Sequence, residues 1–397
     1  MRFSFEIIIG IPGPSPSLVA SSNPGVMTCV FGVYVFMLGP CGSDNVRRDT
    51  TFFLLALAPD ILYHLMSVPG VPFSPLDEAL NSLAPSSEQI RRHRKAVVMF
   101  CSGCRKTDGG PLRKCAKCHT ALYCSKECQT RDWPVHKKMC GGEVQGALKL
   151  LKTMMSNPVL YTKLLECFVL AFDLLRRTRR DEMLLANVNI AVEPANIDDF
   201  EDMLLRNGSS KNNILGMLQV NAVTASADPQ WFVHGRRELW CSHRAMADSA
   251  GCHADTVVIM DVIHANAQMS MTIPLRISKD ILTVLALGGG DFTNISSVTG
   301  DTTTAYTVEC CLEFINAHIR ADKHNQLLLR TKMRPADIQV IRDTANYKDM
   351  DGGLVERFHA KIARESVYRK IYQKFIERRK AVTGVIISPP VLNMLCR

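Results

Sequence analysis

The sequence contains one dense group of metal-binding residue types, in residues 101–140, CSGCRKTDGGPLRKCAKCHTALYCSKECQTRDWPVHKKMC. Cysteine and histidine occur there in four pairs whose members are separated by two or three residues. The candidate ligands are Cys101, Cys104, Cys115, Cys118, Cys124, Cys128, His136 and Cys140. Thiolates and imidazoles at this spacing are typical of tetrahedral zinc sites. Eight ligands complete two such sites, so we expect two structural zinc ions with no position open for a substrate or an activated water.

The spacing also predicts local structure around the ligands. A Cys-x2-Cys pair suits a tight turn in which both thiolates face one ion, whereas the two i, i+4 pairs place both side chains on one face of a short helix. Four such pairs in forty residues are not expected by chance. The spacing leaves open whether consecutive or alternate pairs share an ion.

Composition places this group in a long, mixed chain of 397 residues with 47% hydrophobic content and 15 cysteines. Disulfide frameworks belong to short secreted chains, so paired thiols here predict a reducing compartment and an intracellular protein, nuclear or cytoplasmic. The formal net charge is +9. Seven ligand thiolates contribute seven negative charges and two Zn²⁺ ions four positive ones, which lowers it to about +6. The same correction halves the excess of six basic residues within 101–140, which argues against nucleic-acid binding.

No targeting segment or membrane span is expected at the N-terminus. The apolar runs at 26–38 and 52–58 are shorter than the roughly 20 residues that cross a bilayer. We divide the chain into an N-terminal region of undefined order at 1–96, a zinc finger at 97–142 and a third region at 143–390. A basic run at 91–95 closes the first region, and we interpret it as a solvated flank of the finger in preference to a nuclear import signal.

The third region alternates between helical and strand periodicity, which predicts an α+β fold: a helix-rich domain of about four strands. Strands are expected at 187–193, 215–223, 256–263 and 268–277. Helices are expected at 143–156, 158–177, 197–205, 228–250, 278–288, 308–319, 335–347 and 354–380. The pairs Cys241/His243 and Cys252/His253 within this region are interpreted as helix and cap residues, not as a third metal site.

The residues between the last ligands carry a family resemblance. Tyr123-Cys124-Ser125-x2-Cys128-Gln129, followed by Asp132-Trp133-x2-His136-Lys137-x2-Cys140, resembles the MYND-type zinc finger at all eight ligand positions. The resemblance implies two cross-braced zincs. One would be held by Cys101, Cys104, Cys124 and Cys128, and the other by Cys115, Cys118, His136 and Cys140. The rest of the chain resembles, less specifically, uncharacterised fungal MYND-type proteins.

The resemblance also implies a function, because MYND-type fingers mostly bind short proline-containing peptides. The positions matching Gln129 and Trp133 line the peptide groove in that family. A Trp face on a rigid scaffold can stack on proline, although Trp133 is also large enough to pack the small core of the finger. We therefore predict a zinc-binding, protein-interaction protein that is not an enzyme, with no catalytic residues and no cofactor besides zinc.

The sequence gives little support to two other function classes. Some lysine methyltransferases combine a MYND finger with a SET domain, but neither an Asn-His-Ser-Cys-like nor a Gly-Glu-Glu-Leu-like SET signature is present. A nucleic-acid-binding regulator would need a basic face with stacking residues, and the finger offers lysines but few aromatics.

Overall fold

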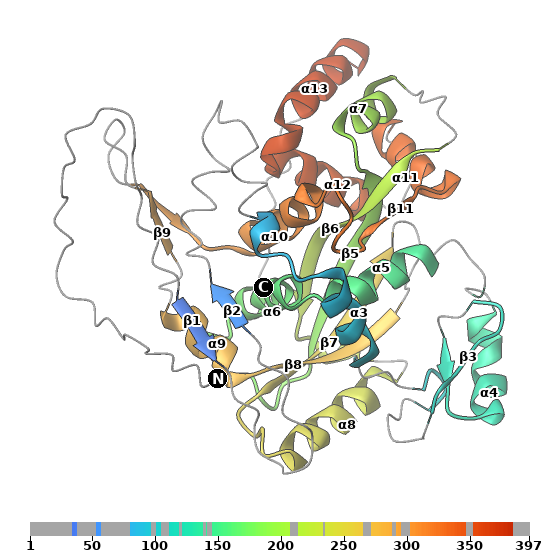
Figure 1. Ribbon diagram of the computed structural model, residues 1–397, viewed down its shortest axis with the longest axis vertical. Helices are drawn as coiled ribbons and strands as arrows, with labels where there is room; N and C mark the ends of the chain where they lie inside the picture. Colours follow the sequence, from blue (N-terminus) through green and yellow to red (C-terminus); the bar gives the residue numbers. More distant parts are fainter. Residues whose placement is uncertain are drawn as a thin grey trace, which may run out of the picture.

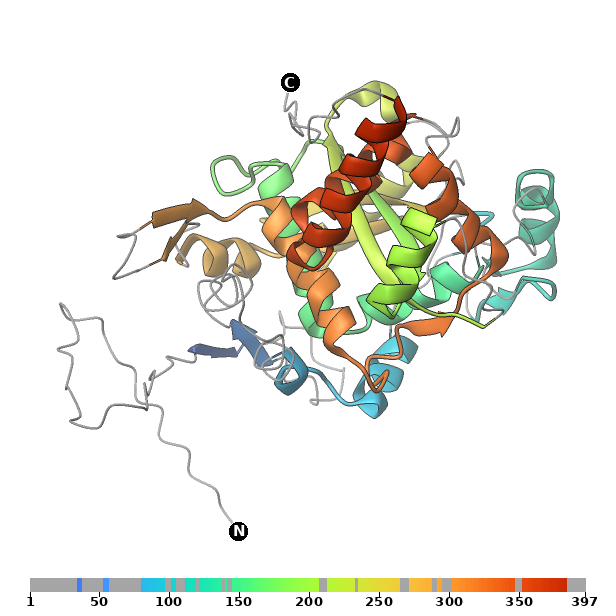
Figure 2. The same cartoon turned by 90° about the horizontal axis from the view of Figure 1, so that it is seen from above.

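The computed structural model describes residues 34–37, 53–56, 80–96, 101–104, 111–118, 121–137, 140, 145–206, 213–232, 235–264, 271–287, 291–294, 302–346 and 352–383. A five-stranded mixed sheet with helices packed around it forms the largest part, and the cysteine-rich finger projects from it (Figures 1 and 2). The expected α+β class is confirmed. The N-terminal region predicted at 1–96 lies outside the described residues except for 34–37, 53–56 and 80–96.

The sheet has the strand order β11-β6-β5-β7-β8. Its strands are β5 (Leu184–Pro194), β6 (Leu215–Ser226), β7 (Thr256–His264), β8 (Met271–Ile277) and β11 (Arg330–Lys332). Only β5 and β7 pair in parallel; the other neighbours are antiparallel. Four strands match those expected, and β11 is an addition. It escaped detection because its three residues, Arg-Thr-Lys, carry no apolar alternation.

Nearly every residue of β5 is buried, so both faces of the central strand are covered. Ala186, Val188 and Ile190 belong to the large apolar core that also contains residues of α5 (Gln145–Met155) and α6 (Pro158–Ala171). Leu185 projects from the opposite face into a smaller cluster with Phe232 and residues of α8 (Arg236–Ser249). The predicted alternation placed only every second residue of this strand in the core, whereas the structure also buries the residues between them.

The helices of this part, apart from α3, are α5 (Gln145–Met155), α6 (Pro158–Ala171), α7 (Ile197–Arg206), α8 (Arg236–Ser249), α9 (Lys279–Leu287), α10 (Val308–Ala321), α11 (Pro335–Asn346), α12 (Gly352–Arg364) and α13 (Arg369–Thr383). Several of them begin at side-chain caps, among them α6, α7, α9 and α10. Asn157 accepts hydrogen bonds from the N–H groups of Val159 and Leu160, and Thr307 accepts one from Cys310.

On each side of the sheet, one residue occupies or removes main-chain hydrogen-bonding groups that would otherwise face outward. Along β6, beyond the short β11, Asn316 of α10 donates to the carbonyl of Val220 and accepts from its N–H, both at 2.8 Å. Along β8, Pro274 stands opposite Ile259 without interrupting the register. A proline has no N–H to give, so it fits here with its nitrogen directed away from β7.

Helix α3 (Ser87–Ala96) precedes the finger and α5 follows it, and the two helices pack against each other. Ile90 of α3 is fully buried in the large core. The chain therefore leaves α3 for the finger and returns beside its starting point in α5. Whether 97–142 and 143–390 are the domain limits stays a prediction.

Two short hairpins and a 3-10 turn lie outside the five-stranded sheet. Strands β1 (Tyr34–Met37) and β2 (Phe53–Ala56) pair antiparallel, as do β9 (Asp291–Asn294) and β10 (Thr302–Ala305). One turn of 3-10 helix, η1 (Pro229–Trp231), precedes α8. In the part of the chain that the structure describes, no helix is long and apolar enough to cross a bilayer.

Three predicted helices were wrong in extent. The helix expected at 228–250 is divided into the 3-10 turn η1 and α8, which begins only at Arg236, after Gly235 with a positive φ of 81°. The helix expected at 158–177 ends at Ala171, and Asp173 takes a positive φ of 52° in the turn that follows. The helix expected at 354–380 is interrupted by a second 3-10 turn, η2 (Ser366–Tyr368). Glu365 adopts an extended conformation there and is buried against α10. A pattern of apolar positions does not reveal such a break.

Candidate metal centre

The finger is a small hairpin followed by one helix. Strands β3 (Arg113–Lys114) and β4 (Leu122–Tyr123) pair antiparallel, and α4 (Lys126–His136) follows directly. The loop at 101–104 is joined to β4 by the Ser102 N–H, which donates to the Leu122 carbonyl at 2.7 Å. This arrangement brings ligands from the start, the middle and the end of the stretch together.

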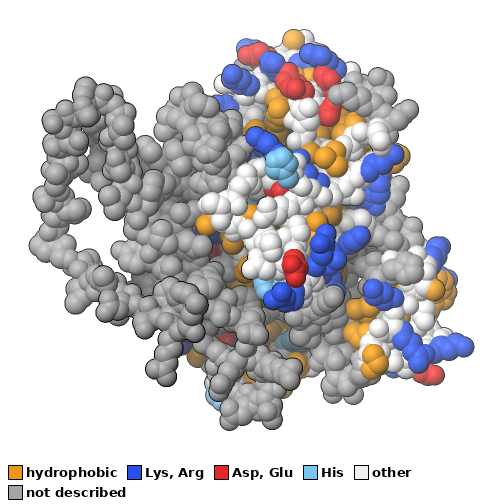
Figure 3. Space-filling view, viewed as in Figure 1, with side chains coloured by type: hydrophobic (Ala, Val, Ile, Leu, Met, Phe, Trp, Pro, Cys, Tyr) orange, Lys and Arg blue, Asp and Glu red, His pale blue; other side chains and the backbone are white. Residues whose placement is uncertain are grey.

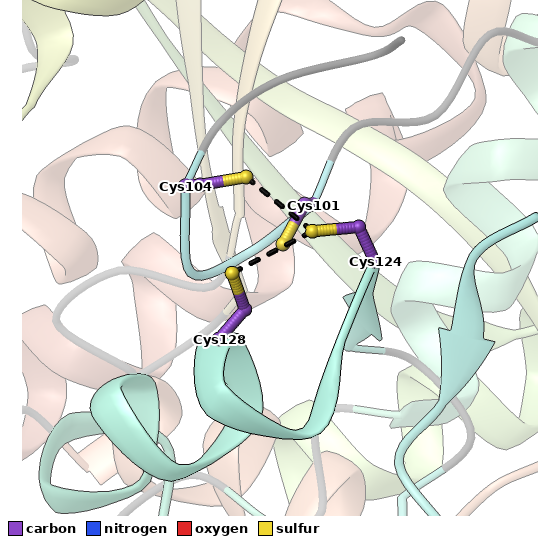
Figure 4. A group of neighbouring side chains, drawn as sticks. All are labelled: Cys101, Cys104, Cys124 and Cys128. Carbon is purple, nitrogen blue, oxygen red and sulfur yellow. Dashed lines mark hydrogen bonds between the residues drawn. The ribbon is translucent and has the colours of Figure 1, made fainter. Parts of the chain in front are cut away.

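The first cluster contains Cys101, Cys104, Cys124 and Cys128, with all ligand atoms within 4.8 Å of one another. Figure 4 shows the four thiols pointing toward a common centre from the 101–104 loop, the end of β4 and the first turn of α4. The Sγ atoms of Cys104 and Cys124 are 3.6 Å apart, and those of Cys124 and Cys128 are 3.5 Å apart. Zn–S bonds of about 2.3 Å in a tetrahedron place sulfurs roughly 3.8 Å apart, so these residues fit a zinc ion.

The second cluster contains Cys115, Cys118, His136 and Cys140, again within 4.8 Å. The Sγ atoms of Cys115 and Cys140 are 3.6 Å apart, and Cys118 Sγ lies 3.5 Å from His136 Nε2. Alternate pairs of the sequence therefore share a centre, which confirms the cross-braced arrangement that the resemblance implied. Each centre has four ligands and no open position, so both fit structural zinc ions.

Backbone donors favour the charged form of one thiol in each cluster, Cys101 in the first and Cys115 in the second, where the pKa is also lowered to about 6. Burial raises the pKa of Cys101, but the N–H groups of Cys124, Cys104 and Gly103 outweigh it and lower the pKa to about 6. The pKa of Cys124 is raised to about 12, first by its hydrogen bond with Cys128. Several thiolates crowded at one point repel each other, and a divalent cation at the centre removes that repulsion.

Two residues that are not ligands help to position the ligands. Tyr123 is 1% exposed, its hydroxyl donates to Asp132 at 2.7 Å, and its ring lies edge-on to that of His136 at 6.1 Å. Gly103 lies so close to α4 that a Cβ atom there would be 2.5 Å from the Cys128 carbonyl oxygen. The ligand pattern did not reveal Gly103, although a glycine between paired cysteines is a signal of a tight backbone approach.

The predicted peptide-binding residues lie one helical turn apart on α4, at i and i+4. Gln129 is half-buried, whereas Trp133 is 42% exposed. The Trp133 ring lies 5.9 Å from that of His136, so the zinc ligand supports one part of the indole while the remainder faces outward. The Trp133 side chain therefore packs against His136 and also remains partly exposed on the surface.

The cysteines and histidines that the structure describes outside the finger form no further cluster of metal-ligand type. Among the described residues, the two clusters of the finger are the groups that could hold a metal ion. Cys241 is exposed on α8, and His253 lies 3.3 Å from Asp248. Cys241 and His243 lie in α8, and Cys252 and His253 follow its end. That these four residues hold no metal stays a prediction.

Sequence reasoning missed a buried polar cluster beside β5. Lys361 Nζ lies 2.5 Å from Glu193 Oε1, and the Tyr368 hydroxyl donates to Glu193 Oε2 at 3.0 Å. Next to them, Glu365 accepts from Arg320 at 2.7 Å and from Asn316 at 2.6 Å. The residues of this polar cluster come from four elements far apart in the sequence, so no local sequence pattern predicts it.

The two cross-braced centres on a hairpin and helix define a MYND-type zinc finger, and the model of that family, described as MYND finger, matches residues 101–140. A second family model, described as Domain of unknown function (DUF8205), matches residues 143–368, more than half of the chain. The chain belongs to this DUF8205 family and carries a MYND finger ahead of the family's domain.

Relatives with curated descriptions match over the finger. Dauer abnormal formation protein 25 of Caenorhabditis elegans is 51% identical over 45 residues, 11% of each chain. N-lysine methyltransferase SMYD2 of Gallus gallus is 50% identical over 40 residues, 10% of this chain and 9% of that protein. A SET and MYND domain-containing protein of Dictyostelium discoideum is 32% identical over 68 residues, 16% of this chain and 12% of that protein. The chain thus spans about a tenth of the length of these relatives. No solved structure matches.

Proposed function

We propose that this is an intracellular adaptor whose finger binds proline-containing segments of a partner protein. Zinc binding and protein interaction are typical of MYND fingers. The observation that carries the finer proposal is the exposed face of α4, where Trp133 leaves 42% of its surface accessible while its ring rests near His136. A large aromatic face on a metal-braced scaffold suits proline rings because little conformational entropy is lost on binding. Gln129, one turn away, would supply a hydrogen bond to the peptide backbone.

The proposal assigns no chemical step to the finger. Both centres are complete with four protein ligands each, so neither ion has a position for a substrate. The methyltransferase descriptions of relatives attach to proteins that share only the finger with this chain. We propose that the DUF8205 domain carries and positions the finger. The likeness to fungal MYND-type proteins stays a prediction.

The test is fluorescence anisotropy with a panel of labelled proline-containing peptides and the full-length, zinc-loaded chain. Trp133→Ala should abolish saturable binding while retaining two zincs per chain by elemental analysis. Trp231→Ala is the matched control, because Trp231 is 53% exposed and lies in η1, outside the finger. Equal binding by both variants would refute the proposed groove, and so would a zinc-loaded chain that binds no peptide of the panel.

A further inference from the structure

Two basic side chains lie on neighbouring helices where the finger joins the rest of the chain, and a third, from the finger, is near enough for its charge to act on one of them. They are Arg94 near the end of α3, Lys114 in β3 of the finger and Lys152 in α5, and we call them the junction cluster. Lys114 is exposed, and the other two are partly buried. None of the three is needed to bind zinc, and none belongs to the proposed peptide face of α4.

Backbone packing holds these charges in place. Helices α3 and α5 are in contact, and Arg94 Nη1 donates to the Thr153 hydroxyl at 3.4 Å, beside Lys152. Lys114 is held by the β3–β4 hairpin, whose strands directly precede the zinc ligands Cys115 and Cys124. The anchoring points of Arg94 and Lys152 cannot separate without breaking the α3–α5 contact.

The cluster has an electrostatic cost that the described chain does not relieve. The pKa of Lys152 is lowered, first by burial and then by repulsion from Lys114 and Arg94. Within the described residues, none of the three forms an ion pair, and the carboxylate of α3, Glu88, pairs with Arg92 instead. An external anion would therefore gain attraction from three cations and also remove their mutual repulsion.

The thiolates of the finger do not cancel this charge. Arg94 and Lys152 lie outside residues 101–140, and exposed Arg91 and Lys149 on the same two helices add to the excess. Figure 3 shows Lys and Arg side chains over α3 and over the finger on one face of the molecule. The thiolates of the zinc ligands lower the net charge of the finger, but most of the basic residues at this position lie outside the finger and keep their excess positive charge.

We infer that the junction cluster binds an acidic segment of the same partner whose proline-containing segment the finger takes. The inference rests on the proposed function and adds a second point of contact to it. A peptide fits better than a nucleic acid, because α3, β3 and α5 contain no Phe, Tyr or Trp on which a base could stack.

The experiment measures anisotropy with the full-length, zinc-loaded chain and three labelled peptides. The first contains the proline segment with neutral flanks, the second adds four glutamates to it, and the third keeps the glutamates but replaces each proline with alanine. At 50 mM salt the acidic flank should raise affinity about tenfold, and 0.5 M salt should remove the gain.

Paired variants assign the gain to the cluster. Lys114→Gln/Lys152→Gln should lose it and bind the neutral peptide unchanged, while Lys114→Arg/Lys152→Arg should keep it. Lys332→Gln/Lys370→Gln removes the same charge from exposed positions on β11 and α13 and serves as the control. Zinc content and melting temperature establish that each variant is folded.

The outcomes separate the two proposals. If the neutral peptide binds but the acidic flank adds nothing, or its gain survives in the glutamine variant, the junction cluster is not an acidic-segment site and the peptide groove stands. If only the two acidic peptides bind, and through Lys114 and Lys152, the cluster stands and the groove falls. Tighter binding of a 20-base-pair DNA duplex through the same lysines would overturn the inference in favour of nucleic acid.

Discussion

Replacing Lys361 with methionine should strongly destabilise the domain, because it leaves the Glu193 carboxylate without its cation. Both side chains are 0% exposed, and Lys361 Nζ lies 2.5 Å from Glu193 Oε1. After the substitution, the contact described for the Glu193 carboxylate is the hydrogen bond that it accepts from the Tyr368 hydroxyl at 3.0 Å. Removing one partner of a buried ion pair costs about 3–5 kcal/mol. Methionine has nearly the volume of lysine, so the loss reflects charge and not a cavity.

The double variant Glu193→Gln/Lys361→Met separates the charge effect from packing. It removes both charges together and leaves a neutral amide that still accepts a hydrogen bond from Tyr368. Replacing a complete buried pair is often close to neutral. We therefore expect the double variant to be more stable than Lys361→Met alone, with a coupling energy of about 2 kcal/mol or more.

Urea unfolding of the zinc-loaded chain, followed by far-ultraviolet circular dichroism, measures these differences. The control is Lys370→Met, the same substitution at an exposed position of α13, which should change the unfolding free energy by less than about 0.5 kcal/mol. A loss below about 1 kcal/mol for Lys361→Met would refute the reasoning. So would a double variant whose loss equals the sum of the two single losses.

Three further substitutions test other parts of the structure. Gly103→Ala should lower the zinc content from two toward one per chain by elemental analysis, because its Cβ would lie 2.5 Å from the Cys128 carbonyl oxygen. The control Gly146→Ala, whose Cβ would have nothing within 4 Å, should keep both zincs. Equal zinc contents in the two variants would contradict this. His318 is 1% exposed with no hydrogen-bond partner for either ring nitrogen in the described chain, and burial lowers its pKa from 6.5 to about 4. The unfolded chain therefore binds a proton that the folded chain refuses between pH 6.5 and 4, so stability falls as pH decreases, by about 2 kcal/mol from pH 7 to 5. Urea titrations should show a smaller loss for His318→Leu, and an unchanged pH dependence would assign the effect to other groups. Asn157→Ala should cost about 1 kcal/mol by removing the cap of α6, with Asn157→Ser restoring most of it; no change in midpoint would argue that the cap is replaced by solvent.

The sequence was sufficient for the metal centres because their ligands are local and chemically distinctive. Eight Cys and His residues in forty positions predicted two zinc sites, and the cross-braced pairing came from the family resemblance. The exposure of Trp133 was not predictable in the same way. A tryptophan can pack or bind, and only its position against His136 shows that it does some of the first while remaining available for the second.

The α+β class was predictable from periodicity, but its details depended on distant contacts. Strand β11 forms because its neighbour β6 offers a free edge, not because Arg330–Lys332 prefers to be a strand. The break between α12 and α13 follows from Glu365, which is buried where Asn316 and Arg320 meet it. Partners separated by about fifty residues leave no trace in a local pattern.

The interruption of main-chain hydrogen-bonding groups on both sides of the sheet affects how this protein behaves at high concentration. An exposed strand edge is a template on which another chain can add by main-chain pairing, the first step of many aggregation processes. Asn316 occupies both main-chain groups of Val220 on one side, and Pro274 removes a donor on the other. Neither side therefore presents a full row of hydrogen-bonding groups to a neighbouring molecule. We expect Pro274→Thr, which restores that donor, to promote self-association of an otherwise well-folded chain.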